Sequence, residues 1–155
     1  MTVLSVHKDP EARRMTLTAE YDAPVDRVWL LWSDPRRLER WWGPPTHPAT
    51  VVDHDLRPGG KVSYYVTGPD GERSPGWWHV RAVDAPRRLD FELGDAGIPP
   101  LAVRVRMDDR PGGGTLMVVE TTFPTTGAMD QLIVMGYEQG LSTAVGQADA
   151  VLAAD

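Results

Sequence analysis

The sequence predicts an α+β fold in which a curved antiparallel sheet packs against a long C-terminal helix. Three observations lead to this prediction. Two short amphipathic helical segments follow the first predicted strand, alternating segments fill the middle of the chain, and an apolar helical pattern runs from 128 to about 153. A run of strands followed by a helix is typical of α+β folds, whereas α/β folds alternate the two.

The first predicted strand covers Met15 to Tyr21, where apolar and polar residues alternate. The run Asp22-Ala23-Pro24 then predicts a helix start, with Asp22 or Ala23 near the cap and Pro24 in the first turn. The run Ser33-Asp34-Pro35 ends this helix and begins a second short one, because aspartate caps helices well and proline fits their first position. Two short helices are therefore expected after the first strand.

Short segments rich in glycine and proline separate the remaining strands, which gives a sheet of about six to seven strands in all. Short connections favour antiparallel pairing. The segment 94–100 is interpreted as a loop. The predicted strands after the two helices are 51–56, 62–66, 77–83, 89–93, 101–107 and 117–123.

The C-terminal pattern predicts one helix of about 25 residues, which would be about 38 Å long. Gly136 and Gly140 interrupt it, and each costs about 1 kcal/mol relative to alanine in a helix interior. Two explanations remain open: the helix approaches the sheet or a partner closely there, or space is left for a ligand beneath it. Gln139 lies between them on the apolar stripe, where a buried amide needs a hydrogen-bonding partner such as a ligand.

Composition narrows the functions that the chain can have. Its 155 residues suit one domain, 1–155, and the absence of cysteine excludes disulfides, thiolate nucleophiles and cysteine-ligated metals. A net charge of −6 disfavours binding to nucleic acid or to acidic membranes. The absence of cysteine makes a cytoplasmic location the expected one. No apolar run is long enough to span a bilayer, and Met1 to Pro10 lacks the basic region and apolar stretch of a secretory signal. The histidines lack metal-ligand spacing, and neither a metal nor a cofactor is expected.

Six short motifs occur in order along the chain and together carry a family resemblance. They are Ala23-Pro24-Val25-Asp26-Arg27-Val28-Trp29, Trp41-Trp42-Gly43-Pro44, Arg57-Pro58-Gly59-Gly60, Gly68-Pro69-Asp70-Gly71, Thr122-Phe123-Pro124 and Met135-Gly136-Tyr137-Glu138-Gln139-Gly140. The chain resembles the START-like or Bet v 1-like (SRPBCC) superfamily, in the branch named for the C-terminal domain of the activator of Hsp90 ATPase. The resemblance extends from about Thr16 to Leu152 and implies a helix-grip fold.

The resemblance has two limits. The family commonly has two prolines before an Arg-Leu pair after its fourth strand, and Ala85-Pro86-Arg87-Arg88-Leu89 keeps one of them. The eukaryotic co-chaperone carries an additional N-terminal domain, for which 155 residues leave no room, so activation of Hsp90 is not expected. The motifs mark turns, caps and packing, and they therefore predict fold rather than activity.

The first functional hypothesis is binding of a small hydrophobic or aromatic molecule in an internal cavity, as the resemblance implies. The orientation of the lining residues is inferred from strand and helix periodicity. The candidate ligand-binding residues are Trp42, Tyr64, Trp78, Leu101, Val103, Met117, Val119, Leu132, Met135 and Gln139.

Two other functions stay open. A polyketide-cyclase-like enzyme would need acid or base groups that converge in the cavity, and the candidates are His79, Tyr64, Glu92 and Tyr137. A protein-interaction or stress-related module would instead have a filled core and an exposed patch made of Trp41, Trp42 or Trp77, which a homodimer could cover. Neighbours on a strand point to opposite faces, so only one of Trp77 and Trp78 is expected to face the interior.

Overall fold

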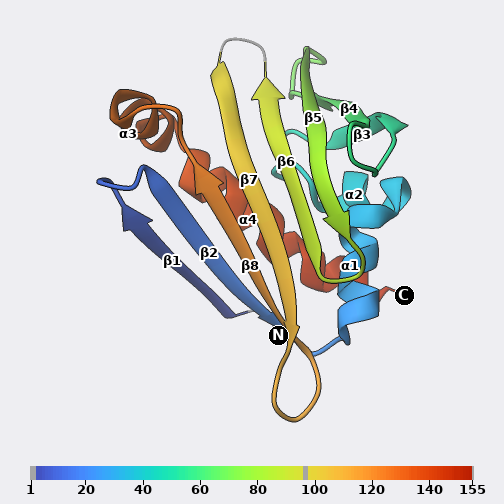
Figure 1. The fold of residues 1–155 in the computed structure, drawn as a ribbon. Helices are drawn as coiled ribbons and strands as arrows, with labels where there is room; N and C mark the ends of the chain where they lie inside the picture. The colour runs from blue at the N-terminus through green and yellow to red at the C-terminus, as the bar shows by residue number, and fades with distance from the viewer. Residues whose placement is uncertain (1–2, 96–97, 155) are drawn as a thin grey trace.

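The computed structural model describes residues 3–95 and 98–154, which form eight strands and four helices (Figure 1). In chain order these are β1 (Val3–Asp9), β2 (Arg14–Tyr21), α1 (Val25–Ser33), α2 (Pro35–Trp41), β3 (Ala49–His54), β4 (Lys61–Thr67), β5 (Arg73–Asp84), β6 (Arg88–Asp95), β7 (Ile98–Asp109), β8 (Thr115–Thr122), α3 (Thr126–Val134) and α4 (Tyr137–Ala153).

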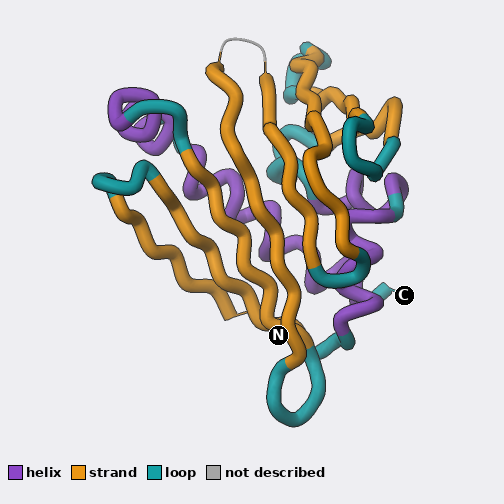
Figure 2. Tube along the Cα trace, in the orientation of Figure 1, coloured by secondary structure: helices purple, strands orange, loops and turns teal. Residues whose placement is uncertain are grey.

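All eight strands of the described chain join one antiparallel sheet in the order β1-β2-β8-β7-β6-β5-β4-β3. Six of the seven neighbouring pairs are consecutive in sequence, and only β2 with β8 joins distant segments. The register shifts in β3, β5 and β6 are irregularities of the kind that bend a sheet. The helices lie on one side of the curved sheet, with α4 crossing it and α1 and α2 near its β3–β5 end (Figures 1 and 2).

Strand alternation places the core between the sheet and α4. Every second residue of β2 and of β8 is buried, so both strands turn one row of side chains toward the helix. The row of β2 is apolar apart from the hydroxyl of Tyr21, whereas the row of β8 begins and ends with a threonine, Thr115 and Thr121. The hydroxyl of Tyr21 on β2 donates to the backbone oxygen of Val145 on α4 over 3.1 Å. This buried hydrogen bond fixes the helix against the sheet.

The two short helices form as the sequence predicts, with one change at the first cap. Asp34 caps α2 by accepting from the backbone N–H of Arg36, and Pro35 takes the first helical position, as predicted. In α1, however, Pro24 is itself the cap residue, with φ −69° and ψ 162°, and the helix begins at Val25. The predicted place of Pro24 in the first turn was wrong by one position, because its backbone is still extended.

The sheet is larger than the predicted six to seven strands. Strand β1 was missed: it forms an edge and pairs only with β2. The predicted loop 94–100 is also partly strand, since β6 reaches Asp95 and β7 begins at Ile98, while 96–97 lie outside the described residues. The antiparallel pairing is as predicted.

The predicted single C-terminal helix is two helices. Gly136 has φ +99° and separates α3 from α4, and its N–H donates to the backbone oxygen of Ile133 at the end of α3. This left-handed backbone ends helices and strongly favours glycine. The break leaves α4 with 17 residues rather than about 25.

Candidate functional site

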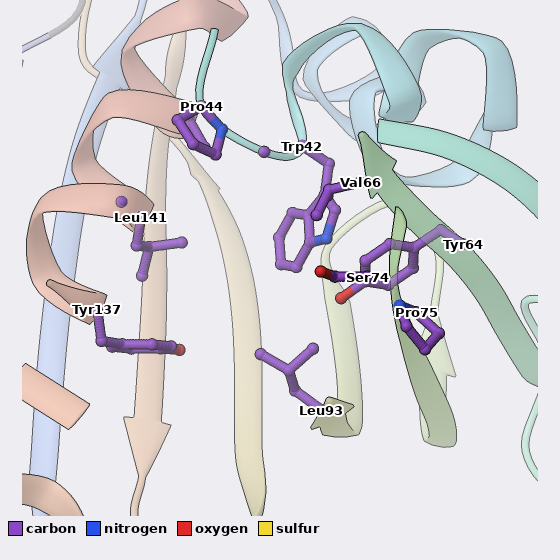
Figure 3. A pocket seen from close by; sticks show the side chains of 12 residues that line it. Trp42, Pro44, Tyr64, Val66, Ser74, Pro75, Leu93, Tyr137 and Leu141 are labelled. Carbon is purple, nitrogen blue, oxygen red and sulfur yellow. The ribbon is translucent and has the colours of Figure 1, made fainter. Parts of the chain in front are cut away.

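A cavity of about 290 Å³, partly open to solvent, lies between α4 and the β4–β6 part of the sheet (Figure 3). Its walls are mostly apolar and come from four parts of the fold. They are Tyr137, Gly140, Leu141 and Ala144 of α4; Trp42, Gly43 and Pro44 after α2; Tyr64 and Val66 of β4; and Ser74, Pro75 and Leu93 of β5 and β6.

Gly140 gives the cavity part of its volume. It lies inside α4, and a Cβ atom at this position would meet no heavy atom within 4 Å outside the adjacent helix backbone. Close approach of the helix to the sheet therefore does not explain this glycine. Of the two explanations left open by the sequence, empty space beneath the helix is the one that the structure favours.

A second glycine positions the ring of Tyr64. Gly76 pairs with Tyr64 across β4 and β5, and a Cβ atom at Gly76 would lie 2.5 Å from the ring carbon Cζ of Tyr64. Two atoms cannot approach so closely, so only glycine lets this ring lie over the neighbouring strand. The ring thereby forms one wall of the cavity instead of filling it.

The position of Trp42, another wall of the cavity, depends on a side chain of α4. The amide nitrogen of Gln147 donates to the backbone oxygens of Trp41, over 3.2 Å, and Gly43, over 2.7 Å. These bonds hold both sides of Trp42, whose ring packs edge-on against Tyr64 and Trp78 with centroid distances of 6.1 and 5.2 Å. The helix thus fixes the loop that supplies the largest aromatic wall.

Three side chains that line the cavity carry hydroxyls: Tyr64, Ser74 and Tyr137. Tyr137 forms a 3.0 Å hydrogen bond with Thr121 of β8, whose side chain is fully buried. Burial raises the pKa of Tyr137 to about 12, an effect that outweighs the opposite influence of the Thr121 hydrogen bond. The hydroxyl is therefore protonated at neutral pH. Ser74 and Tyr64 supply hydroxyls on the opposite wall.

The ten predicted ligand-binding residues divide into three groups. Trp42 and Tyr64 line the cavity. Six others are buried in the core around it without lining it, namely Trp78, Leu101, Val103, Met117, Val119 and Leu132. Met135 and Gln139 do not face inward as expected: Met135 is 67% exposed and Gln139 is also exposed. The break at Gly136 explains this difference, since it interrupts the helical periodicity from which their orientation was inferred.

The four acid–base candidates do not converge. Tyr64 and Tyr137 both line the cavity, whereas His79 and Glu92 pair across β5 and β6 on the outer face. His79 is exposed, and Glu92 forms an ion pair with Arg81. Strand alternation requires this placement, because Trp78 points inward and its neighbours therefore point outward.

The tryptophans do not form an exposed patch. Trp41 and Trp78 are buried, Trp42 faces the cavity, and Trp77 lies on the outer face over Gly94. The patch expected of a protein-interaction module, made of Trp41, Trp42 or Trp77, is thus divided between the core, the cavity and the outer face. Of Trp77 and Trp78, the one that faces the interior is Trp78.

Sequence reasoning missed several cavity residues that have no chemical signature. Leu141 and Ala144 have the ordinary composition of an amphipathic helix, and Ser74 and Pro75 precede the predicted start of their strand at Trp77. In the described part of the chain, no helix is long and apolar enough to cross a membrane. Within those same residues, no three His, Cys, Asp or Glu side chains gather as metal ligands would.

Comparisons with known proteins agree with this architecture. The model of the family described as activator of Hsp90 ATPase homolog 1-like protein matches residues 22–153. Protein Ms6760 from Mycobacterium smegmatis is 42% identical, with a TM-score of 0.88 over 98% of this chain and 97% of that one. A protein from Arthrobacter aurescens is 41% identical, with a TM-score of 0.92 over 97% and 92% of the two chains. A Rhodobacter sphaeroides protein shares the fold at 20% identity, with a TM-score of 0.90 over 99% and 100%. No curated protein gave a match.

Proposed function

Because the chain belongs to the family of activator of Hsp90 ATPase homolog 1-like proteins, we propose that its helix-grip fold binds one small, largely apolar molecule between the sheet and α4. The observation that carries this proposal is the cavity itself, into which Gly140 projects no side chain. A helix that only had to cover the sheet would be more stable with alanine at this position.

The volume of the cavity limits the size of the ligand. An apolar cavity of about 150 Å³ holds one benzene molecule. The cavity here measures about 290 Å³, near the lower end of ligand sites in proteins. A molecule of one or two rings fits this volume, whereas a long acyl chain or a sterol would require the walls to move.

Tryptophan fluorescence and thermal melting against a panel of one- and two-ring compounds test the proposal. A ligand that binds only the native state must raise the melting temperature. Because Trp42 is the only tryptophan among the described residues that line the cavity, Trp42→Phe should remove most of the ligand-induced quenching while leaving a rise in melting temperature. Quenching that is undiminished in the Trp42→Phe protein would place the ligand elsewhere, and no response from any compound would contradict the proposal.

An enzymatic role remains the alternative hypothesis. It has fewer candidate acid–base residues in the cavity than the sequence predicted. Only Tyr64 and Tyr137 among the four candidates line the cavity. Tyr137, with its raised pKa, acts as a hydrogen-bond donor rather than a base at neutral pH. Incubation of each bound compound with the protein, followed by mass spectrometry, distinguishes the two: unchanged compounds support binding alone, and turnover would favour the enzyme.

A further inference from the structure

We infer that the ligand is a neutral molecule that carries a hydrogen-bond acceptor, and that the hydroxyl of Tyr137 donates to this acceptor. The inference rests on the proposed function and specifies the chemical class of the ligand for the same cavity. It follows from the charge of the walls, from the geometry of the Tyr137 hydroxyl, and from the number of protons in the Thr121–Tyr137 pair.

The walls offer no charged partner to a charged ligand. None of the residues that line the cavity in the described chain has a charged side chain. An unpaired charge moved from water into such surroundings loses several kcal/mol of hydration, so a neutral molecule binds better.

The hydrogen bond between the hydroxyls of Thr121 and Tyr137 leaves one of their two protons free to be donated to another group. Each hydroxyl carries a single proton, and the 3.0 Å hydrogen bond between them uses only one of the two. When Thr121 donates to Tyr137, the proton of Tyr137 is available to a third group. The Tyr137 hydroxyl points away from α4 into the cavity (Figure 3), where a ligand acceptor would receive this proton.

The arrangement is suited to donation rather than to acceptance from a ligand. Thr121 lies on β8 and is fully buried, and its hydrogen bond with the tyrosine oxygen holds the Tyr137 hydroxyl in place. Tyr137 is protonated at neutral pH, because its ordinary pKa of 10.0 already lies well above 7 and burial raises the pKa further, to about 12. A carbonyl, ether or ring-nitrogen acceptor next to Tyr137 would therefore complete a chain from Thr121 through Tyr137 to the ligand.

Three probes of similar size test the inference: coumarin, which is neutral with a carbonyl acceptor; naphthalene, which has no strong acceptor; and 2-naphthoate, which is an anion. Their dissociation constants are measured by tryptophan quenching for the unmodified protein, for Tyr137→Phe and for Tyr65→Phe as a matched control. Tyr65 follows Tyr64 on β4, does not line the cavity, and has the guanidinium of Arg73 over its ring at 4.5 Å. Tyr137→Phe should weaken coumarin about threefold to tenfold, the worth of one neutral hydrogen bond, and leave naphthalene unchanged. Unchanged naphthalene binding also shows that the variant keeps its cavity.

The outcomes separate this inference from the proposed function. Three results would each overturn the inference while binding in the cavity stands. They are equal effects of Tyr137→Phe on coumarin and naphthalene, an equally large loss of coumarin affinity in Tyr65→Phe, and tighter binding of 2-naphthoate than of coumarin. If none of the three probes binds, the proposed function and the inference fail together.

Discussion

At the scale of single residues, glycines and hydroxyls define the site more than the aromatic side chains do. Gly140 leaves space in α4, and Gly76 lets the ring of Tyr64 lie over the neighbouring strand. The sequence drew attention to Gly140 because a glycine inside a helix is costly. It could not identify Gly76, because the close contact of this glycine with Tyr64 depends on the register of β4 and β5.

Gly76→Ala tests the packing of Tyr64 directly. The new methyl group would overlap the tyrosine ring, so either the ring or the strand must move. We expect a loss of about 1–3 kcal/mol in the free energy of unfolding, measured by urea denaturation, together with weaker ligand binding. Gly146→Ala is the control, because Gly146 is an exposed residue inside α4, and this protein should not lose stability. Gly71→Ala is unsuitable as a control, because the φ of Gly71 is +82°. Equal stability of the Gly76→Ala and Gly146→Ala proteins would contradict the packing described for Tyr64.

At the scale of elements, the strands and short helices follow local sequence patterns, whereas the contacts that build the cavity do not. Alternation predicted most strands, and Asp34 with Pro35 predicted the start of α2. The split of the C-terminal helix was missed, since the sequence shows Gly136 but not its left-handed backbone. The inward orientation inferred for Met135 and Gln139 failed for the same reason.

The loop after α2 is the element whose position matters most for the cavity. Gln147 donates to both Trp41 and Gly43, so Gln147→Ala leaves two backbone oxygens without this donor. We expect a loss of about 1–3 kcal/mol in unfolding free energy and a change in the fluorescence of Trp42. Gln131→Ala on α3 is the matched control, because that glutamine is exposed. A Gln147→Ala protein indistinguishable from the control would show that the loop is held by other contacts.

At the scale of the whole molecule, the architecture could be predicted because it depends on the order of elements, whereas the site depends on how they pack. The family resemblance and the strand pattern predicted the antiparallel sheet and the helix that crosses it. Only two of the ten predicted ligand-binding residues, Trp42 and Tyr64, line the cavity, since periodicity identifies the inner face but not where that face is left unfilled. Three statements remain predictions: residues 1–155 fold as one domain, the protein is cytoplasmic, and it forms a homodimer.

Two tyrosines, the buried Tyr21 and the partly buried Tyr137, make the stability of the whole fold sensitive to alkaline pH. Burial raises the pKa of Tyr137 from 10.0 to about 12, and it also raises the pKa of Tyr21. Above pH 10 the unfolded chain loses these protons while the folded chain keeps them, so the unfolding free energy should fall between pH 10 and pH 12. Urea denaturation across this range should show a smaller decline for Tyr137→Phe than for the unmodified protein. An identical decline would mean that Tyr137 titrates normally in the folded state.

The central claim is that the space beneath α4 is a binding site, and filling that space tests it most directly. Gly140→Leu places a side chain into the cavity, and Gly146→Leu places the same side chain on the exposed face of the same helix. Both remove a helix-interior glycine, so neither should lower helix stability. Isothermal titration with a compound identified by the fluorescence panel should show that Gly140→Leu loses at least tenfold in affinity while Gly146→Leu binds like the unmodified protein. Full affinity in a folded Gly140→Leu protein would contradict the claim.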